Sequence, residues 1–344
     1  MLDRTPPKRI QILFLATCIR TIESHSSCGV MNSICVNSEY SVQDEHLSDF
    51  CRAIGVRCFS TGDLFWSSYG LRLFSPLPAY RQISLSPKDL SYIWKQGALF
   101  IHYFTSDDCP FYPGYDLIVE DKNYDFDNIQ SAKRRHNIRW ALKHCNVERV
   151  PFELLLKIGL PLVEETYNRL SLRFNGSVLE RWKNYFRAAV SNPMFQAWGV
   201  FVLNQLAAFN FHIYCRDGAY IPMIFSRTDL LKWHPVDALV FVSTQHAMAR
   251  DGVAHISYGR RPLTGVDTDS LVNFKESMGY KKIPLKERLE VNPVVKPVFS
   301  RPLSSATKAL ADLFYHRSGY ARIVSGVIST LRGQIKLSDA GYGG

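Results

Sequence analysis

The sequence contains no hydrophobic run long enough to cross a membrane. None of its apolar stretches approaches the roughly 20 residues that a membrane-spanning helix needs. A short apolar run at residues 10–19 follows Lys8 and Arg9, but the residues after it lack the small-residue pattern of a signal-peptide cleavage site. We therefore expect a cytoplasmic protein without stable membrane insertion, in which residues 10–19 form a buried strand or begin a helix.

The sequence also lacks the cysteine and histidine spacings of metal sites. Its eight cysteines include no C-x-x-C pair, and its histidines complete no zinc-binding pattern. Cys28 and Cys35 are seven residues apart, as are Cys51 and Cys58, and this spacing matches no common ligand motif. We expect reduced, mostly buried thiols and no bound metal.

No block of five or six like charges is present, although the net charge is +10. A basic surplus of this size indicates an anionic partner, such as phosphate, nucleic acid or lipid headgroups. Because the charges are dispersed, they do not select one of these partners. The hydrophobic fraction of 46% is typical of a packed globular protein.

The first part of the chain shows scattered signals for strands and helices. Ser86 and Pro87 predict the start of a helix that ends near Gly97, because serine is a good N-cap and proline suits the first helical position. Buried strands are expected at residues 98–105 and 115–119. Residues 1–130 are thus predicted to form an N-terminal α/β half.

The rest of the chain shows a more regular succession. The pair Asp217–Gly218 between two apolar runs predicts a hairpin, and Pro235 and Gly252 mark the two ends of a helix. In order, the expected elements are a basic helix at 129–145, helices at 151–170 and 178–191, strands at 195–203, 206–215 and 219–226, a helix at 235–250, a strand at 255–258, a helix at 270–278 and a strand at 280–284.

This order resembles that of the GNAT-type acyltransferases, in particular their Fem-like branch. The local matches are the basic helix Arg134-Arg135-His136-Asn137-Ile138-Arg139-Trp140-Ala141, the strand His255-Ile256-Ser257-Tyr258-Gly259 after the central helix, and Phe274-Lys275 followed by Gly279-Tyr280. The resemblance implies an α/β fold with a GNAT-like mixed central sheet flanked by helices, in two tandem GNAT-like halves. It places the acyltransferase domain at residues 131–292, with a degenerate copy at 1–130 and a helical extension and tail at 293–344.

Two departures from the family pattern concern the acyl donor. GNAT-type enzymes hold the diphosphate of CoA in a glycine-rich turn before the central helix, and residues 226–234 contain no glycine. Many also carry a tyrosine on the last helix, where this chain has Phe274 and Lys275. We expect no permanently bound cofactor and leave acyl-CoA and aminoacyl-tRNA open as donors.

The resemblance and the predicted elements together nominate site residues. Tyr258 and Asp229 are the predicted catalytic residues, although a core position for the Tyr258 ring is the alternative. The predicted substrate-binding residues are Arg134, Arg135, Arg139, His212, Tyr214, Lys232, Arg260 and Lys275. For the arginines the alternative is a solvated helix face or turn, and for His212 it is a hydrogen-bonded core histidine.

The predicted function is an N-acyltransferase of bacterial type that moves an acyl or aminoacyl group onto an amine of a sugar, lipid or peptide precursor. The expected partners are a small-molecule or cell-envelope precursor and, for one donor, tRNA. The alternative is a non-catalytic basic module that binds RNA or anionic lipid through residues 134–143. The sequence leaves the acceptor, the acyl chain length and the oligomeric state open.

Overall fold

A mixed β-sheet runs through the described chain. The computed structural model describes residues 41–68, 72–109, 111–170, 172–259, 269–299, 325–331 and 334. The order of the main strands in the sheet is β1-β2-β3-β5-β13-β6-β12-β10-β9-β8-β7, with β4 beside β5 and β11 beside β9. The strands are β1 (Cys58–Thr61), β2 (Leu64–Ser68), β3 (Leu73–Leu77), β4 (Gln82–Ile83), β5 (Phe100–Thr105), β6 (Tyr112–Val119), β7 (Asn146–Val150), β8 (Phe195–Val202), β9 (Gln205–Cys215), β10 (Gly218–Tyr220), β11 (Ile224–Ser226), β12 (His255–Ser257) and β13 (Lys281–Val291).

The N-terminal half begins with helix α2 (Ser41–Ala53) and continues as an antiparallel meander, β1-β2-β3. Helix α3 (Pro87–Lys95) then crosses back so that β5 lies parallel to β3. The Ser86 side chain accepts a hydrogen bond from the main chain of Asp89, and the Asp89 side chain accepts one from Ser86. This capping box confirms the helix start that Ser86 and Pro87 predict.

The C-terminal half repeats this succession. Strands β8, β9 and β10 form an antiparallel meander, and helix α8 (Pro235–Met248) crosses back so that β12 lies parallel to β10. Both halves therefore contain three antiparallel strands followed by a helix and a parallel strand, which confirms the predicted pair of GNAT-like halves. The other helices are α4 (Ala132–His144), α5 (Phe152–Leu154), α6 (Leu160–Arg169), α7 (Gly176–Ala189) and α9 (Asp269–Ser277).

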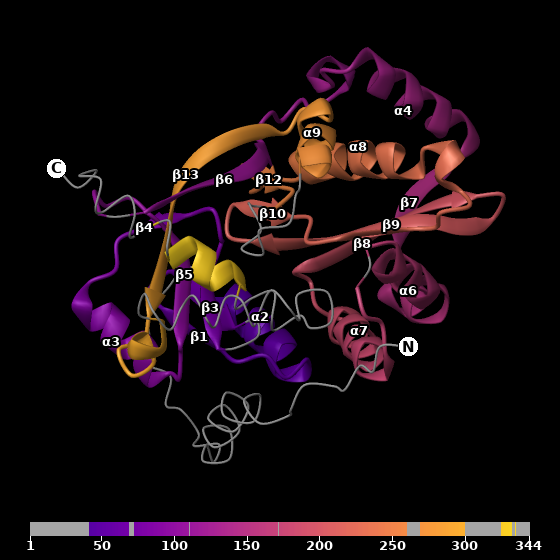
Figure 1. The fold of residues 1–344 in the computed structure, drawn as a ribbon. Helices are drawn as coiled ribbons and strands as arrows, with labels where there is room; N and C mark the ends of the chain where they lie inside the picture. Colours follow the sequence, from indigo (N-terminus) through magenta and orange to yellow (C-terminus); the bar gives the residue numbers. More distant parts are fainter. Residues whose placement is uncertain are drawn as a thin grey trace, which may run out of the picture. The chain divides into compact units, whose positions relative to one another are not determined.

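The two halves exchange their last strands. Strand β6 follows β5 in the sequence but pairs with β12, and β13 follows β12 but pairs with β5. The exchanged strands also pair with each other, antiparallel and with Pro284 opposite Tyr115. In Figure 1, β13 extends from α9 towards α3. The sheet is consequently continuous across both halves, with β6 and β13 at its centre.

Helices pack on both faces of the C-terminal half because alternate side chains of a strand point to opposite faces. Phe209 and Phe211 of β9 join a buried cluster with α6 and α7. On the other face, Ala208 packs with Leu239 of α8, and Asn210 donates a hydrogen bond to Ser243 of the same helix. Strand β9 is therefore buried on both faces.

Several local features differ from the expectations. The strand expected at 219–226 is interrupted after Tyr220 and resumes at Ile224, because residues 221–223 leave the pairing with β9. The helix expected at 151–170 contains a π-helical segment, Leu155–Gly159. Strands β2, β4 and β7 were not predicted. The element expected at 10–19 and most of the helical extension and tail expected at 293–344 lie outside the described residues. Among the described residues, no helix is long and apolar enough to span a membrane.

Candidate functional site

The candidate site lies where two parallel strands diverge. Strands β10 and β12 pair from Gly218 to Tyr220, and Ile221 N extends the pairing by donating to the carbonyl oxygen of Ser257 at 2.9 Å. Beyond this point the chain continues into β11, which pairs with β9. All three residues of β12 pair with β10, and the turn that begins at Tyr258 lies past the end of this pairing, at the edge where α/β folds commonly bind ligands.

A buried lysine reaches this end of β12. Lys275 of α9 is 8% exposed, and its Nζ donates a hydrogen bond to the main-chain carbonyl oxygen of Tyr258. The same Nζ lies 4.4 Å from the centre of the Tyr258 ring. Burial lowers the pKa of Lys275 to about 8, and the carboxylate of Asp116 partly offsets this effect. The side chain is therefore an amine poised to change charge near neutral pH.

Asp116 of β6 anchors the polar groups around this lysine. Its Oδ1 accepts hydrogen bonds from Ser257 Oγ at 2.8 Å and from Leu117 N at 2.7 Å. Ser257 Oγ in turn accepts from Gly259 N at 3.2 Å. Gly259 has a φ of +90°, and a Cβ at this position would lie 3.5 Å from Lys275 Nζ. A carboxylate, a hydroxyl and an amine thus surround the turn that follows β12.

Tyr258 forms the apolar side of this cluster. Its ring is buried and contacts those of Tyr280 and Phe274, with centroid distances of 5.4 and 6.5 Å. Burial raises the pKa of Tyr258 well above its usual value, so the phenol remains protonated. Its position beside Lys275 fits both the predicted proton donor and the alternative core role.

The N-terminus of α8 already holds an anion from the chain itself. Asp237 in its first turn is 3% exposed, and its Oδ1 lies 2.7 Å from Arg134 Nη1. Asn137 Nδ2 donates to the other carboxylate oxygen at 3.2 Å, and His234 precedes the helix with a φ of 54°. Burial raises the pKa of Asp237, an effect that Arg134 partly offsets. Because a buried carboxylate occupies this turn and the preceding loop has no glycine, the residues do not fit a CoA diphosphate here.

The three arginines of α4 have different partners. Arg134 pairs with Asp237, Arg135 donates to the carbonyl oxygen of Ile129, and the Arg139 guanidinium lies 4.8 Å from the centre of the Phe126 ring. Arg134 therefore ties α4 to α8. These separate contacts give no support to the prediction that all three arginines bind substrate.

His212 and Tyr214 lie on the face of β9 that is covered by α8. His212 is fully buried, and burial lowers its pKa to about 3, so its imidazole is neutral. Its Nδ1 lies 3.4 Å from Tyr214 Oη, which donates to Gln196 at 3.0 Å. These contacts favour the core alternative for both residues.

The remaining predicted residues lie apart from Lys275 in the hydrogen-bonding network. Asp229 is on the surface and accepts two hydrogen bonds from Arg227, which lower the pKa of its carboxyl and make it a weak base. Lys232 Nζ lies 5.9 Å from the centre of the Trp233 ring. Arg260 lies outside the described residues.

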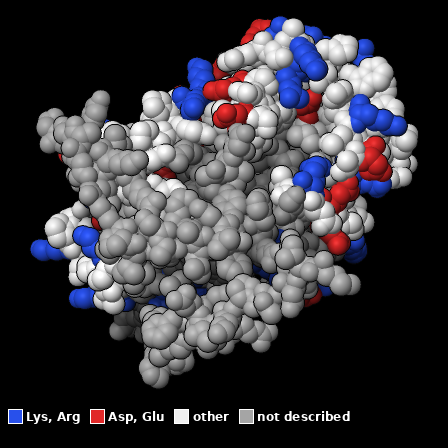
Figure 2. Space-filling view, viewed as in Figure 1, with Lys and Arg blue, Asp and Glu red and all other residues white. Residues whose placement is uncertain are grey.

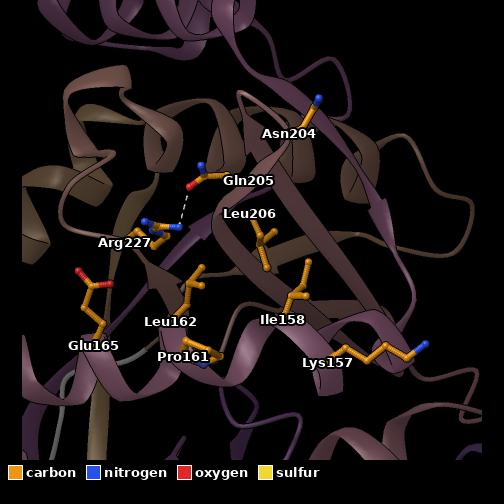
Figure 3. Close-up of a pocket in the computed structure, with 9 residues that line it drawn as sticks. All are labelled: Lys157, Ile158, Pro161, Leu162, Glu165, Asn204, Gln205, Leu206 and Arg227. Carbon is orange, nitrogen blue, oxygen red and sulfur yellow. Dashed lines mark hydrogen bonds between the residues drawn. The ribbon is translucent and has the colours of Figure 1, made fainter.

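A surface pocket of about 550 Å³ lies between the π-helical segment and the β8–β9 turn. Figure 3 shows its lining, including the hydrogen bond from Arg227 to Gln205. It contains none of the predicted site residues. Its lining residues are Lys157, Ile158, Pro161, Leu162, Glu165, Asn204, Gln205, Leu206 and Arg227.

Sequence reasoning missed Asp116 and Ser257. Asp116 is the single acidic residue of a strand whose later positions are apolar, and this was the available signal. Its proximity to Ser257 depends on the pairing of β6 with β12, two strands separated by most of the C-terminal half.

Comparisons with known proteins agree with this architecture. No family model and no curated protein matches the sequence. Among solved structures, FemX matches with a TM-score of 0.52 and 10% identity, over 74% of this chain and 93% of FemX. The C-terminal domain of a candidate lysylphosphatidylglycerol synthetase from Agrobacterium fabrum matches with a TM-score of 0.50 and 13% identity, over 82% of this chain and 98% of that domain. The chain therefore shares the fold of these two structures, which is the GNAT-like fold that its sequence motifs predict.

Proposed function

We propose that this protein is an N-acyltransferase that moves an acyl or aminoacyl group onto an amine of a sugar, lipid or peptide precursor. The observation that carries the proposal is the buried Lys275, which donates to the carbonyl oxygen of Tyr258 just after β12 and has a pKa of about 8. The likeness to FemX and to the lysylphosphatidylglycerol synthetase domain supports it at the level of the fold.

Such a transfer has one electrostatic requirement that this cluster can meet. The neutral acceptor amine attacks the acyl carbon, a C–N bond forms, and negative charge develops on the carbonyl oxygen. The bond to the leaving group then breaks, and the leaving group takes up the proton that the amine nitrogen loses. At pH 7 a lysine of pKa about 8 is roughly 90% protonated, so Lys275 supplies a cation that stabilises this oxygen. Asp116 and Ser257 act as positioning residues, since they fix the turn against which Lys275 packs.

For the donor we propose an aminoacyl ester, as in an aminoacyl-tRNA, rather than acyl-CoA. The anion of Asp237 occupies the α8 turn where a diphosphate would bind. The net charge of +10 suits a nucleic-acid donor. In this proposal, Lys275 and the carbonyl oxygen of Tyr258 to which it donates lie beside the reacting group.

Mass spectrometry of ligands that copurify with the protein tests the donor, and a turnover assay tests the site. Purified protein is supplied in parallel with aminoacyl-tRNA and acyl-CoA, together with amine acceptors. We expect turnover with aminoacyl-tRNA and a loss of about 100-fold in Lys275→Ala, within the range for removing one oxyanion-stabilising group. Exposed Lys281→Ala is the control and should retain full activity. Equal activity of the two variants would remove Lys275 from the site.

A further inference from the structure

Helix α4 presents a basic outer face with no acidic residue. Its inner face buries Asn137, Ile138 and Ala141 against the rest of the domain. Lys133, Arg139 and Lys143 are exposed, and the thirteen residues of the helix include no Asp or Glu. Arg134 is neutralised by Asp237, so the cations that remain are those directed to solvent.

Large apolar side chains are interleaved with these cations. Trp140 and Leu142 of α4 are 43% and 39% exposed, and Leu231 of the 3-10 helix η3 (Leu231–Trp233) is 37% exposed. All three are exposed large hydrophobic side chains, although others in the described chain, such as Leu203 at 78%, are more exposed. The exposure of these apolar side chains to water is unfavourable, and covering them with a partner protein or a membrane removes this free-energy penalty.

Aromatic rings join the two elements into one surface. The His144 ring lies 4.1 Å from that of Trp140 and 5.6 Å from that of Trp233, measured between centroids. Cys145 Sγ contacts the carbonyl oxygen of Trp233 at 3.6 Å, and Lys232 extends the basic charge onto η3. Figure 2 shows Lys and Arg side chains, with acidic ones between them, over the region of the molecule where α4 lies.

We propose that the outer face of α4 together with η3 is a docking surface for the headgroup region of an anionic lipid membrane. Tryptophan rings favour the boundary between headgroups and acyl chains, and exposed leucines gain by entering it. Lysines and arginines at the same level are attracted by anionic lipids. The protein binds there peripherally, since no described helix spans a membrane.

The aliphatic residues favour a membrane over single-stranded RNA. RNA binding uses aromatic faces open to stacking bases, whereas here Trp140, His144 and Trp233 pack on one another. Leu142 and Leu231 have no charge or hydrogen-bond donor with which to bind a phosphate backbone. The proposal does not depend on the transfer activity.

Vesicle sedimentation tests this surface directly. The full chain is mixed with vesicles of phosphatidylcholine alone, or of phosphatidylcholine with phosphatidylglycerol. We expect binding to the anionic vesicles only, weakened by salt. The double variant Lys133→Glu/Lys143→Glu should bind about tenfold more weakly or worse, because each basic residue near the surface contributes to attraction. Trp140→Ser/Leu231→Ser should also weaken binding, although it leaves the charge unchanged.

A matched control separates the surface from net charge. Lys88→Glu/Lys95→Glu makes the same charge change on α3, where both lysines are exposed, and should bind almost as well as the unaltered chain. Circular dichroism establishes that each variant is folded. The proposal is overturned if the control is as impaired as Lys133→Glu/Lys143→Glu, if anionic vesicles do not bind, or if a single-stranded RNA binds in their place.

Discussion

Lys275 combines burial, a carbonyl partner and proximity to a carboxylate in one side chain. Burial makes its charged form costly, and Asp116 only partly compensates. A protein usually avoids such a position unless the charge has a use. The next two predictions concern the effect of this charge on activity and its effect on the free energy of unfolding.

The first prediction concerns the pH dependence of activity. If Lys275 acts as a cation, kcat should fall as pH rises through about 8, because the amine then loses its proton. Lys275→Arg keeps its charge at that pH and should abolish this fall, even where its overall rate is lower. Rate profiles between pH 6 and pH 10 measure both. An identical decline in both proteins would assign the titration to another group.

The second prediction concerns stability. The pKa of Lys275 falls from 10.5 to about 8 on folding, so holding the charge at pH 7 costs about 3 kcal/mol. Lys275→Met removes that cost and also the bond to Tyr258, worth about 1 kcal/mol, so it should stabilise the fold by about 2 kcal/mol at pH 7. The advantage should shrink from pH 8 to pH 10.5, where the unfolded lysine still binds a proton that the folded one has lost. Urea unfolding at these pH values measures it, and a destabilised variant at pH 7 would contradict it.

Individual residues were predictable where a local motif marked them. Tyr258 was nominated from its position at the end of a strand and Lys275 from the family motif on the last helix, and the structure brings them into contact. Asp116 was not, because its role depends on strand pairing. Arg134 was predicted to bind substrate, but it forms an ion pair with Asp237, which is about 100 residues away in the sequence. In the sequence, Asp237 looks like any carboxylate in the first turn of a helix.

At the scale of elements, glycine and proline marked most boundaries correctly. The α3 and α8 helices begin at the predicted prolines, and α9 is followed by the turn at Gly279. The break between β10 and β11 was missed because residues 221–223 are apolar enough to continue a strand. Hydrophobic pattern predicts burial, whereas hydrogen-bond pairing decides where a strand ends.

Gly279 yields a prediction with a matched control. It has a φ of +87°, and a Cβ there would lie 2.6 Å from the main-chain oxygen of Asn128. Gly55 has a φ of +70° with open space around it. Gly55→Ala should therefore cost only the left-handed backbone penalty, about 1 kcal/mol, and Gly279→Ala should cost at least about 2 kcal/mol because backbone must also move.

Thermal or urea unfolding of the two alanine variants measures this difference. An equal loss of unfolding free energy in the two variants would show that the backbone at Asn128 moves away from the new Cβ without a measurable energy penalty.

At the scale of the whole molecule, the exchange of β6 and β13 makes each half incomplete alone. Strand β5 pairs with β13 from Lys286 to Val291, and β12 pairs with β6 at Ile256 and Ser257. The sequence predicted two GNAT-like halves but not this exchange, since both arrangements bury the same apolar strands. The predicted boundary at residue 131 separates them along the chain, whereas the sheet joins them in space.

The fourth prediction follows from this continuity. A fragment of residues 41–130 lacks β13, so β5 and β6 have no intervening partner, and it should show neither dispersed NMR signals nor a cooperative melt. The full chain should unfold in one transition when followed by circular dichroism and by tryptophan fluorescence. A folded fragment, or two separated transitions, would show that the halves are independent.

The same exchange sets an order on synthesis. As the chain emerges from the ribosome, β5 is complete at residue 105, but the strand that covers its free edge ends at residue 291. The edge of β5 that β13 will cover therefore stays unpaired while nearly two hundred further residues are synthesised. An unpaired apolar strand edge of this kind promotes aggregation of nascent chains and binding to chaperones. We therefore expect the time at which β13 leaves the ribosome, rather than the time at which the first half is complete, to govern how far the protein depends on chaperones. The same time should govern its yield at different translation speeds.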